Sequence, residues 1–141
     1  MKDIKGLNSF ATDLKAEEEG IWTPVGDMEF RIAKAGNKQW RALQKRLEAT
    51  EYGNYNKART KRDDEKDAQI LLRCLAETSV LDWKNVTLDG KDIPYSVEKS
   101  ISILTDKRFK KLAGILLEIA LDEEAYAEEV TAEDIKKPKT T

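Results

Sequence analysis

Histidine is absent from this 141-residue chain, and cysteine occurs only once. Without histidine the chain lacks the commonest general base and the commonest metal ligand. A lone cysteine excludes an internal disulfide and a zinc cluster, and it makes an intracellular compartment the default. Cys74 lies inside the apolar run ILLRCLAE, so we interpret it as a buried structural thiol. Carboxylates are numerous, but no pattern indicates a catalytic pair. We expect no enzymatic activity, no metal and no cofactor.

Long apolar runs and glycine-rich loops are also missing. No window approaches the ~18 apolar residues that cross a bilayer, and the opening residues MKDIKGLNSF lack the hydrophobic region of a signal peptide. The seven glycines are scattered, which excludes a phosphate-binding loop. The net charge of −2 lacks the basic excess of a nucleic-acid binder. We therefore expect a cytoplasmic protein without membrane association.

What the chain has in excess is charge. Charged residues make up 37% of it, well above the ~25% of an ordinary domain, and the 40% of hydrophobic residues is enough for a modest core. Apolar residues recur at helical spacing in four segments. These stripes are Trp40, Leu43 and Leu47; Leu71, Leu72 and Leu75; Val97, Ile101 and Leu104; and Phe109, Leu112 and Leu116. The residues suited to cap the four helices are Asn37, Asp63 or Asp64, Ser96 and Asp106.

One segment near the N-terminus has the period of a strand. In residues 28–32, MEFRI, apolar and polar side chains alternate. Gly26-Asp27 predicts a tight turn, so residues 21–25 form the other strand of a hairpin, and Pro24 places that strand at an edge. The sequence thus predicts a mainly α fold, a compact helical domain of four to five helices with a small N-terminal β-hairpin at about residues 21–34.

The two ends of the chain are predicted to be simpler. Ile4, Leu7, Phe10 and Leu14 recur at near-helical spacing, so residues 1–16 form either an arm or a short helix. Residues 17–130 form the single helical domain, and residues 131–141 a flexible C-terminal tail.

Residues 80–98, VLDWKNVTLDGKDIPYSVE, interrupt the helical pattern. We interpret them as a connector between two helices: Asp89-Gly90 favours a tight turn, and Trp83 at the end of the preceding helix packs the connector against the core. Pro94 keeps the chain extended before the Ser96 cap. The structural connector comprises Trp83, Val86, Asp89, Gly90, Pro94, Tyr95 and Ser96.

This segment and the order of elements around it resemble the tail assembly chaperone family of long-tailed, siphovirus-type bacteriophages. The resemblance covers residues 20 to about 130, including the family's strand followed by a helix, and it is carried by Trp83, Val86, Asp89, Gly90, Lys91, Ile93, Pro94, Tyr95, Ser96, Glu98 and Leu104. It implies a non-enzymatic protein of the host cell cytoplasm that binds the tape measure protein, keeps it soluble and recruits tail tube protein. Such proteins leave before the tail is finished, and relatives commonly also make a longer frameshifted form. On this resemblance the matching residues are scaffold.

The C-terminal residues 122–134 contain seven acids and no base. Tyr126 and Val130, four apart, extend the apolar stripe of the preceding helix by one turn. We predict that this segment docks against a basic, helical stretch of the tape measure protein or a neighbouring copy of the chain; the alternative is a solubilising terminal helix. The candidate partner-binding residues are Glu123, Glu124, Tyr126, Glu128, Glu129 and Val130.

Two other functions stay open from the sequence. A basic cluster next to aromatic residues is typical of single-strand nucleic-acid binding; its members are Lys57, Arg59, Lys61 and Arg62, with Tyr52 and Tyr55 nearby. Four acids follow at once, so a solvated charged loop explains the run better. The second alternative is a structural head-to-tail or tail component, which would stay in the finished particle.

Overall fold

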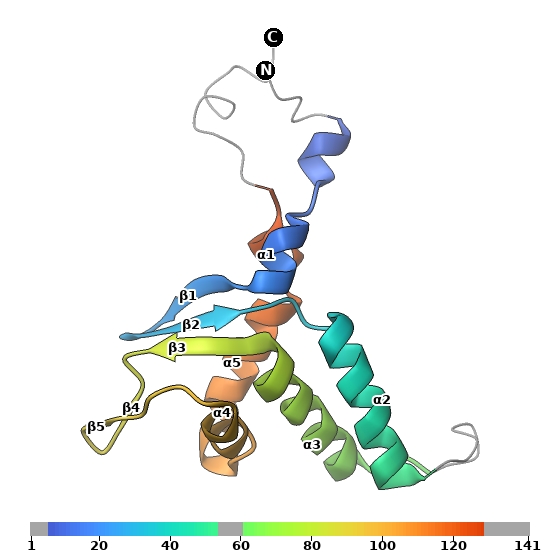
Figure 1. Ribbon diagram of the computed structural model, residues 1–141, viewed down its shortest axis with the longest axis vertical. Helices are drawn as coiled ribbons and strands as arrows, with labels where there is room; N and C mark the ends of the chain where they lie inside the picture. The colour runs from blue at the N-terminus through green and yellow to red at the C-terminus, as the bar shows by residue number, and fades with distance from the viewer. Residues whose placement is uncertain (1–5, 54–60, 129–141) are drawn as a thin grey trace.

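The computed structural model describes residues 6–53 and 61–128. Its centre is an antiparallel sheet of three strands in the order β1 (Ile21–Val25), β2 (Met28–Ile32) and β3 (Val80–Lys84) (Figure 1). β1 and β2 form the hairpin predicted from the sequence, closed at Val25 and Met28. β2 lies between its two neighbours, and Phe30 and Ile32 on it are 1% and 0% exposed.

The prediction of a mainly α domain with an isolated hairpin is wrong, because the fold is mixed α/β. β3 pairs with β2, so the hairpin is part of a three-stranded sheet. A second, two-stranded sheet consists of β4 (Thr87–Leu88) and β5 (Lys91–Asp92). Trp83 therefore lies on a strand, opposite Phe30, and not at the end of a helix.

The helices lie mainly on one side of the sheet (Figure 1). α2 (Lys38–Tyr52) and α3 (Asp64–Cys74) run side by side, and α4 (Val97–Leu104) and α5 (Lys110–Leu121) complete this side. The predicted capping residues are confirmed. Side-chain oxygens of Asn37, Asp63 and Ser96 accept hydrogen bonds from backbone N–H groups in the first turns of α2, α3 and α4. Asp106 caps a 3₁₀ turn, Lys107–Phe109, that leads into α5.

α3 passes into the sheet without a loop. A π-helical turn, Leu75–Ser79, continues the helix and ends where β3 begins. The turn is in the core: Leu75, Ala76 and Ser79 are fully buried. The buried Ser100 hydroxyl on α4 donates a hydrogen bond of 2.8 Å to the Ala76 carbonyl, which joins this turn to α4. Both the helix and the strand are therefore held by the same buried turn.

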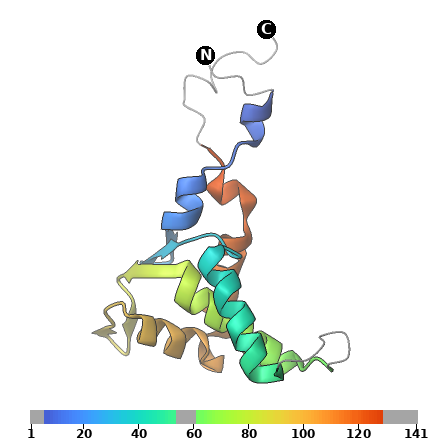
Figure 2. The same cartoon turned by 45° about the vertical axis from the view of Figure 1, so that its right-hand side comes forward.

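The first and last segments of the described chain lie together above the sheet in Figures 1 and 2, away from α2, α3 and α4. A 3₁₀ turn, Leu7–Phe10, precedes the short helix α1 (Leu14–Glu19), and a second 3₁₀ turn, Glu123–Tyr126, follows α5. The segment predicted as an arm or a short helix, residues 1–16, contains the 3₁₀ turn and the start of α1, with Thr12 between them in a β-bridge. Residues 1–5 lie outside the described residues. The tail predicted for residues 131–141 lies outside the described residues.

Candidate interaction surface

Three large apolar side chains stand out from the N-terminal arm, which we define as residues 6–14. Leu7 is 90% exposed, Phe10 82% and Leu14 72%. Leu7 and Phe10 lie on the 3₁₀ turn and Leu14 begins α1, with extended residues between them. Single exposed apolar residues are ordinary, but a group of them on one segment marks a binding surface. The sequence contained this signal in the spacing of the apolar residues, but it did not show whether the rest of the chain covers them.

The arm is held in place by the acidic segment, defined as residues 122–128. The Asp13 N–H donates to the Tyr126 carbonyl at 2.8 Å, and the Glu128 N–H donates to the Ala11 carbonyl at 3.1 Å. Thr12 and Ala127 form an antiparallel bridge between these two bonds. The segments before Leu14 and after α5 therefore lie side by side, and each supports the position of the other.

Tyr126 fixes this pair of segments to the core. Its ring is fully buried, and its hydroxyl donates a hydrogen bond of 2.9 Å to the Ile32 carbonyl at the end of β2. Burial raises the pKa of this phenol well above its ordinary value. Tyr126 was predicted to contact a partner; its side chain instead anchors the acidic segment, because α5 ends at Leu121 and the following 3₁₀ turn directs the ring inward.

The other predicted partner-binding residues are acidic and on the surface. Glu123, Glu124 and Glu128 are exposed, and Glu123 lies 3.3 Å from the Lys34 ammonium. Glu129 and Val130 lie outside the described residues. The arm, α1 and the acidic segment together carry eight acids and one lysine, namely Asp13, Glu17, Glu18, Glu19, Asp122, Glu123, Glu124, Glu128 and Lys15. These three segments are therefore both apolar and strongly acidic.

A groove of about 490 Å³ runs beside Leu14, between α1 and the start of α2. Its lining includes Leu14, Glu17 and Glu18 from α1 and Lys34, Lys38 and Arg41 from the opposite wall. The apolar arm thus ends at a concave surface that offers acidic groups on the α1 side.

Two aromatic residues of the predicted connector, Trp83 and Tyr95, pack at the sheet. The Trp83 indole lies between Phe30 and Tyr95, with ring centroids 6.1 and 5.0 Å away in edge-to-face geometry. Its Nε1–H donates to the Ile93 carbonyl at 2.7 Å. The Tyr95 hydroxyl donates to the Val80 carbonyl at 2.8 Å, and burial raises the pKa of that phenol.

The turn of this connector has the geometry that its residues favour. Asp89 and Gly90 have φ values of 53° and 77°, and they join β4 to β5. Two central residues with positive φ are typical of a type I′ hairpin turn, for which Asp-Gly is a preferred pair. Val86 is buried, Pro94 is exposed just before α4, and Ser96 caps that helix with a bond to the Lys99 N–H at 3.0 Å.

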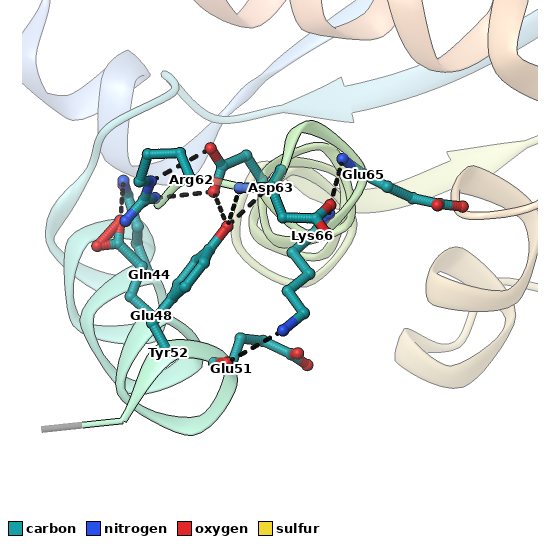
Figure 3. Close-up of polar contacts among 9 residues, drawn as sticks. Gln44, Glu48, Glu51, Tyr52, Arg62, Asp63, Glu65 and Lys66 are labelled. Carbon is teal, nitrogen blue, oxygen red and sulfur yellow. Dashed lines mark hydrogen bonds and ion pairs between the residues drawn. The ribbon is translucent and has the colours of Figure 1, made fainter. Parts of the chain in front are cut away.

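A polar cluster joins the ends of α2 and α3 (Figure 3). The Tyr52 hydroxyl donates to Asp67 at 2.7 Å and accepts from the Asp63 N–H at 3.1 Å. Arg62 donates to the same Asp67 oxygen at 2.8 Å and lies 4.3 Å from the Tyr52 ring centroid. The hydrogen bond from Tyr52 and then the Arg62 guanidinium hold the pKa of Asp67 below its ordinary value. Lys66 closes the cluster by donating to the Glu51 carbonyl at 3.5 Å.

This cluster bears on the nucleic-acid alternative. Arg62 and Tyr52, two members of the basic and aromatic run, are bound to each other and to Asp67 within the α2–α3 pair. Lys57, Arg59 and Tyr55 lie outside the described residues, whereas Lys61 is described and exposed. Arg62 and Tyr52 therefore help to hold α2 and α3 together.

Two further findings concern the described residues as a whole. Within residues 6–53 and 61–128, no group of three or more His, Cys, Asp or Glu side chains is placed to hold a metal ion. None of the helices in the same ranges has the length and apolar character that a membrane span requires.

Comparison with known families places the chain among phage proteins. The family model described as YdaY prophage protein matches residues 29–137, which is most of the chain. No curated protein and no solved structure matches the chain. The match extends from β2 through β3 and α5 to the acidic segment, and the arm and β1 precede it. This phage-derived chain belongs to the YdaY prophage protein family.

Proposed function

We propose that this prophage protein is a tail assembly chaperone, a non-enzymatic binding protein that keeps the tape measure protein soluble and recruits tail tube protein. The observation that supports the proposal most directly is the arm, on which Leu7, Phe10 and Leu14 are between 72% and 90% exposed. An apolar segment of this kind covers the apolar face of an amphipathic partner helix. The charged surface elsewhere keeps such a complex in solution.

The phage family and the segment from Trp83 to Ser96 support the same proposal. The family provides the phage origin, and the order of elements resembles that of tail assembly chaperones. On this proposal the protein acts in the host cell cytoplasm, alone or as several copies with a longer frameshifted form, and it is absent from the finished virion.

The test is co-expression with the tape measure protein of the same prophage, followed by measurement of soluble tape measure protein and by pull-down. Wild-type protein is expected to keep the partner soluble. A variant with Leu7, Phe10 and Leu14 changed to serine is expected to lose this activity while its circular dichroism spectrum stays unchanged. The comparison variant changes three apolar residues outside the arm that are 38–42% exposed, Leu71, Leu88 and Val97, to serine, and its circular dichroism spectrum is recorded as well.

Two results would overturn the proposal. One is a tape measure protein that stays insoluble beside wild-type protein, and the other is an arm variant that works as well as the comparison variant. Mass spectrometry of purified phage particles separates the remaining alternative. Stoichiometric amounts of the protein in the particles would make it a structural head-to-tail or tail component.

A further inference from the structure

The apolar arm and the acids around it occupy one end of the molecule. Backbone hydrogen bonds between residues 11–13 and 126–128 bring the arm and the acidic segment together. The exposed Leu7, Phe10 and Leu14 therefore lie within an environment to which the described chain contributes eight carboxylates and a single lysine from the arm, α1 and the acidic segment. Lys34 lies at the side of this environment and pairs with Glu123, and Lys38 and Arg41 lie with it on the far wall of the groove beside Leu14.

We propose that this end is a docking surface for a basic amphipathic helix of a partner protein, which deepens the proposed function and rests on it. The apolar face of the partner helix packs against the three exposed arm side chains, which lie on the 3₁₀ turn and at the start of α1. The Lys and Arg side chains beside that face meet carboxylates such as Glu18 on α1 and Glu124 on the acidic segment, both exposed.

The negative charge of this surface favours a basic helix over a second copy of the chain, a nucleic acid or an anionic lipid. A second copy that used the same surface in a two-fold dimer would bring eight carboxylates against eight, because such an interface is self-complementary. Phosphate groups of nucleic acids and anionic lipids would be repelled for the same reason. With a basic helix, the opposite charges speed association and disfavour wrong partners. Both effects weaken as salt screens the charges.

The part of the arm next to α1, residues 11–13, is held against the body of the protein. The Asp13 and Ala11 backbone bonds fix the arm against residues 126–128, and Tyr126 fixes those residues to β2. Because residues 11–13 are held in this position before binding, the partner does not have to supply the energy for ordering this part of the arm.

The inference is tested with two synthetic 20-residue amphipathic helical peptides as probes. They share one leucine face, and their polar faces carry lysine in the first and glutamate in the second. Fluorescence anisotropy with the full chain measures both affinities. The lysine peptide is expected to bind at least about tenfold more tightly than the glutamate peptide, equivalent to about 1.4 kcal/mol. Raising the salt from about 0.05 to about 0.5 M is expected to reduce this difference, because the Debye length shortens.

Matched variants locate the binding surface. The arm variant with serine at Leu7, Phe10 and Leu14 is expected to lose binding of the lysine peptide by about tenfold or more. Glu18→Gln with Glu124→Gln is expected to weaken it by about three- to tenfold. The control, Asp92→Asn with Glu98→Gln, removes the same charge from exposed sites on β5 and α4 and is expected to leave the affinity within about twofold.

Equal binding of the two peptides, unchanged binding by the arm or acid variant, or a dimer in sedimentation that the arm variant abolishes would each overturn the inference. This failure is distinguishable from failure of the proposed function. If the lysine peptide does not bind but the tape measure protein stays soluble, only the surface and its partner chemistry are wrong. If the lysine peptide binds and the tape measure protein stays insoluble, only the proposed function is wrong.

Discussion

Replacing Trp83 with alanine is expected to lower the free energy of unfolding by about 4 kcal/mol. The indole is 5% exposed, and a large aromatic side chain buries about 200 Å². At about 25 cal/mol per Å², this area corresponds to about 5 kcal/mol as an upper estimate. Measured values for replacing a buried tryptophan or phenylalanine by alanine are about 3–5 kcal/mol. The loss combines the edge-to-face contacts with Phe30 and Tyr95 and the hydrogen bond to Ile93.

The measurement is urea denaturation followed by far-UV circular dichroism, because the substitution itself changes the tryptophan fluorescence. In a thermal scan the same loss corresponds to about 12–20 °C, interpolating for a chain of this length. Trp83→Phe keeps a ring but removes the bond to the Ile93 carbonyl, so it is expected to cost about 1–2 kcal/mol.

Trp22 provides the matched control. It lies on β1, is 39% exposed and has the Lys84 ammonium 4.3 Å from its ring centroid. Trp22→Ala is expected to cost about 1 kcal/mol, since an exposed cation–π pair contributes little. If Trp83→Ala cost no more than Trp22→Ala, Trp83 would not be a packing residue. If its melting temperature were unchanged but binding of the tape measure protein were lost, Trp83 would be a contact residue.

Four other expectations concern single positions. Gly114→Ala, inside α5 with no atom within 4 Å of the added Cβ, is expected to raise the free energy of unfolding by about 0.5–1 kcal/mol. Gly20→Ala is expected to lower the free energy of unfolding by about 1–3 kcal/mol, because Gly20 has a φ of 85° and the added Cβ would lie 3.1 Å from the Ile32 carbonyl carbon. Urea titrations that rank the two variants in the reverse order would contradict this reasoning. Asp67→Asn should be less stable than wild type at neutral pH. The folded-state pKa of Asp67 lies below the ordinary 3.8, so the carboxylate contributes stability above about pH 4. The stability difference between wild type and variant is lost as the pH falls through the folded-state pKa. A stability difference that persists at pH 2 would exclude the charged carboxylate as its source. Burial raises the pKa of the Cys74 thiol to about 11, so the thiol should react with Ellman's reagent at pH 8 only after unfolding; a fast reaction of folded protein would refute its burial.

The helix starts could be predicted from the sequence because their causes are local. Asn37 and Ser96 each accept a hydrogen bond from the N–H three residues further along, and Asp63 does so two and three residues along. Such interactions depend on residues that are neighbours in the chain. The β1–β2 hairpin was predictable for the same reason, since its turn lies between its strands.

β3 could not be predicted, because its pairing is non-local and its side-chain pattern imitates a helix. Its register against β2 shifts between Arg31 and Ile32, which leaves Leu81 as an extra residue. Val80 and Trp83 therefore both face the core at a spacing of three, whereas a regular strand has a spacing of two. This pattern continues the apolar stripe of α3, so the sequence favoured a longer helix.

The candidate interaction surface was predicted only in part. The acidic composition of residues 122–128 was evident. Tyr126 was assigned to the surface because helical spacing was assumed to continue beyond α5, and the 3₁₀ turn at Glu123–Tyr126 changes the direction of its ring. The exposure of Leu7, Phe10 and Leu14 depends on which side chains the rest of the folded chain covers, and the local sequence pattern does not predict this.

The passage from α3 through the π-helical turn into β3 limits how the length of this protein can change in evolution. One residue inserted or deleted within Leu75–Ser79 would turn every following side chain of β3 to the opposite face. Trp83 would then point to solvent and Asp82 to the core. Members of the family should therefore differ in length between α2 and α3 or in the turn at Asp89-Gly90, where insertions are tolerated. From the start of α3 to the end of β3, all of them should have the same number of residues.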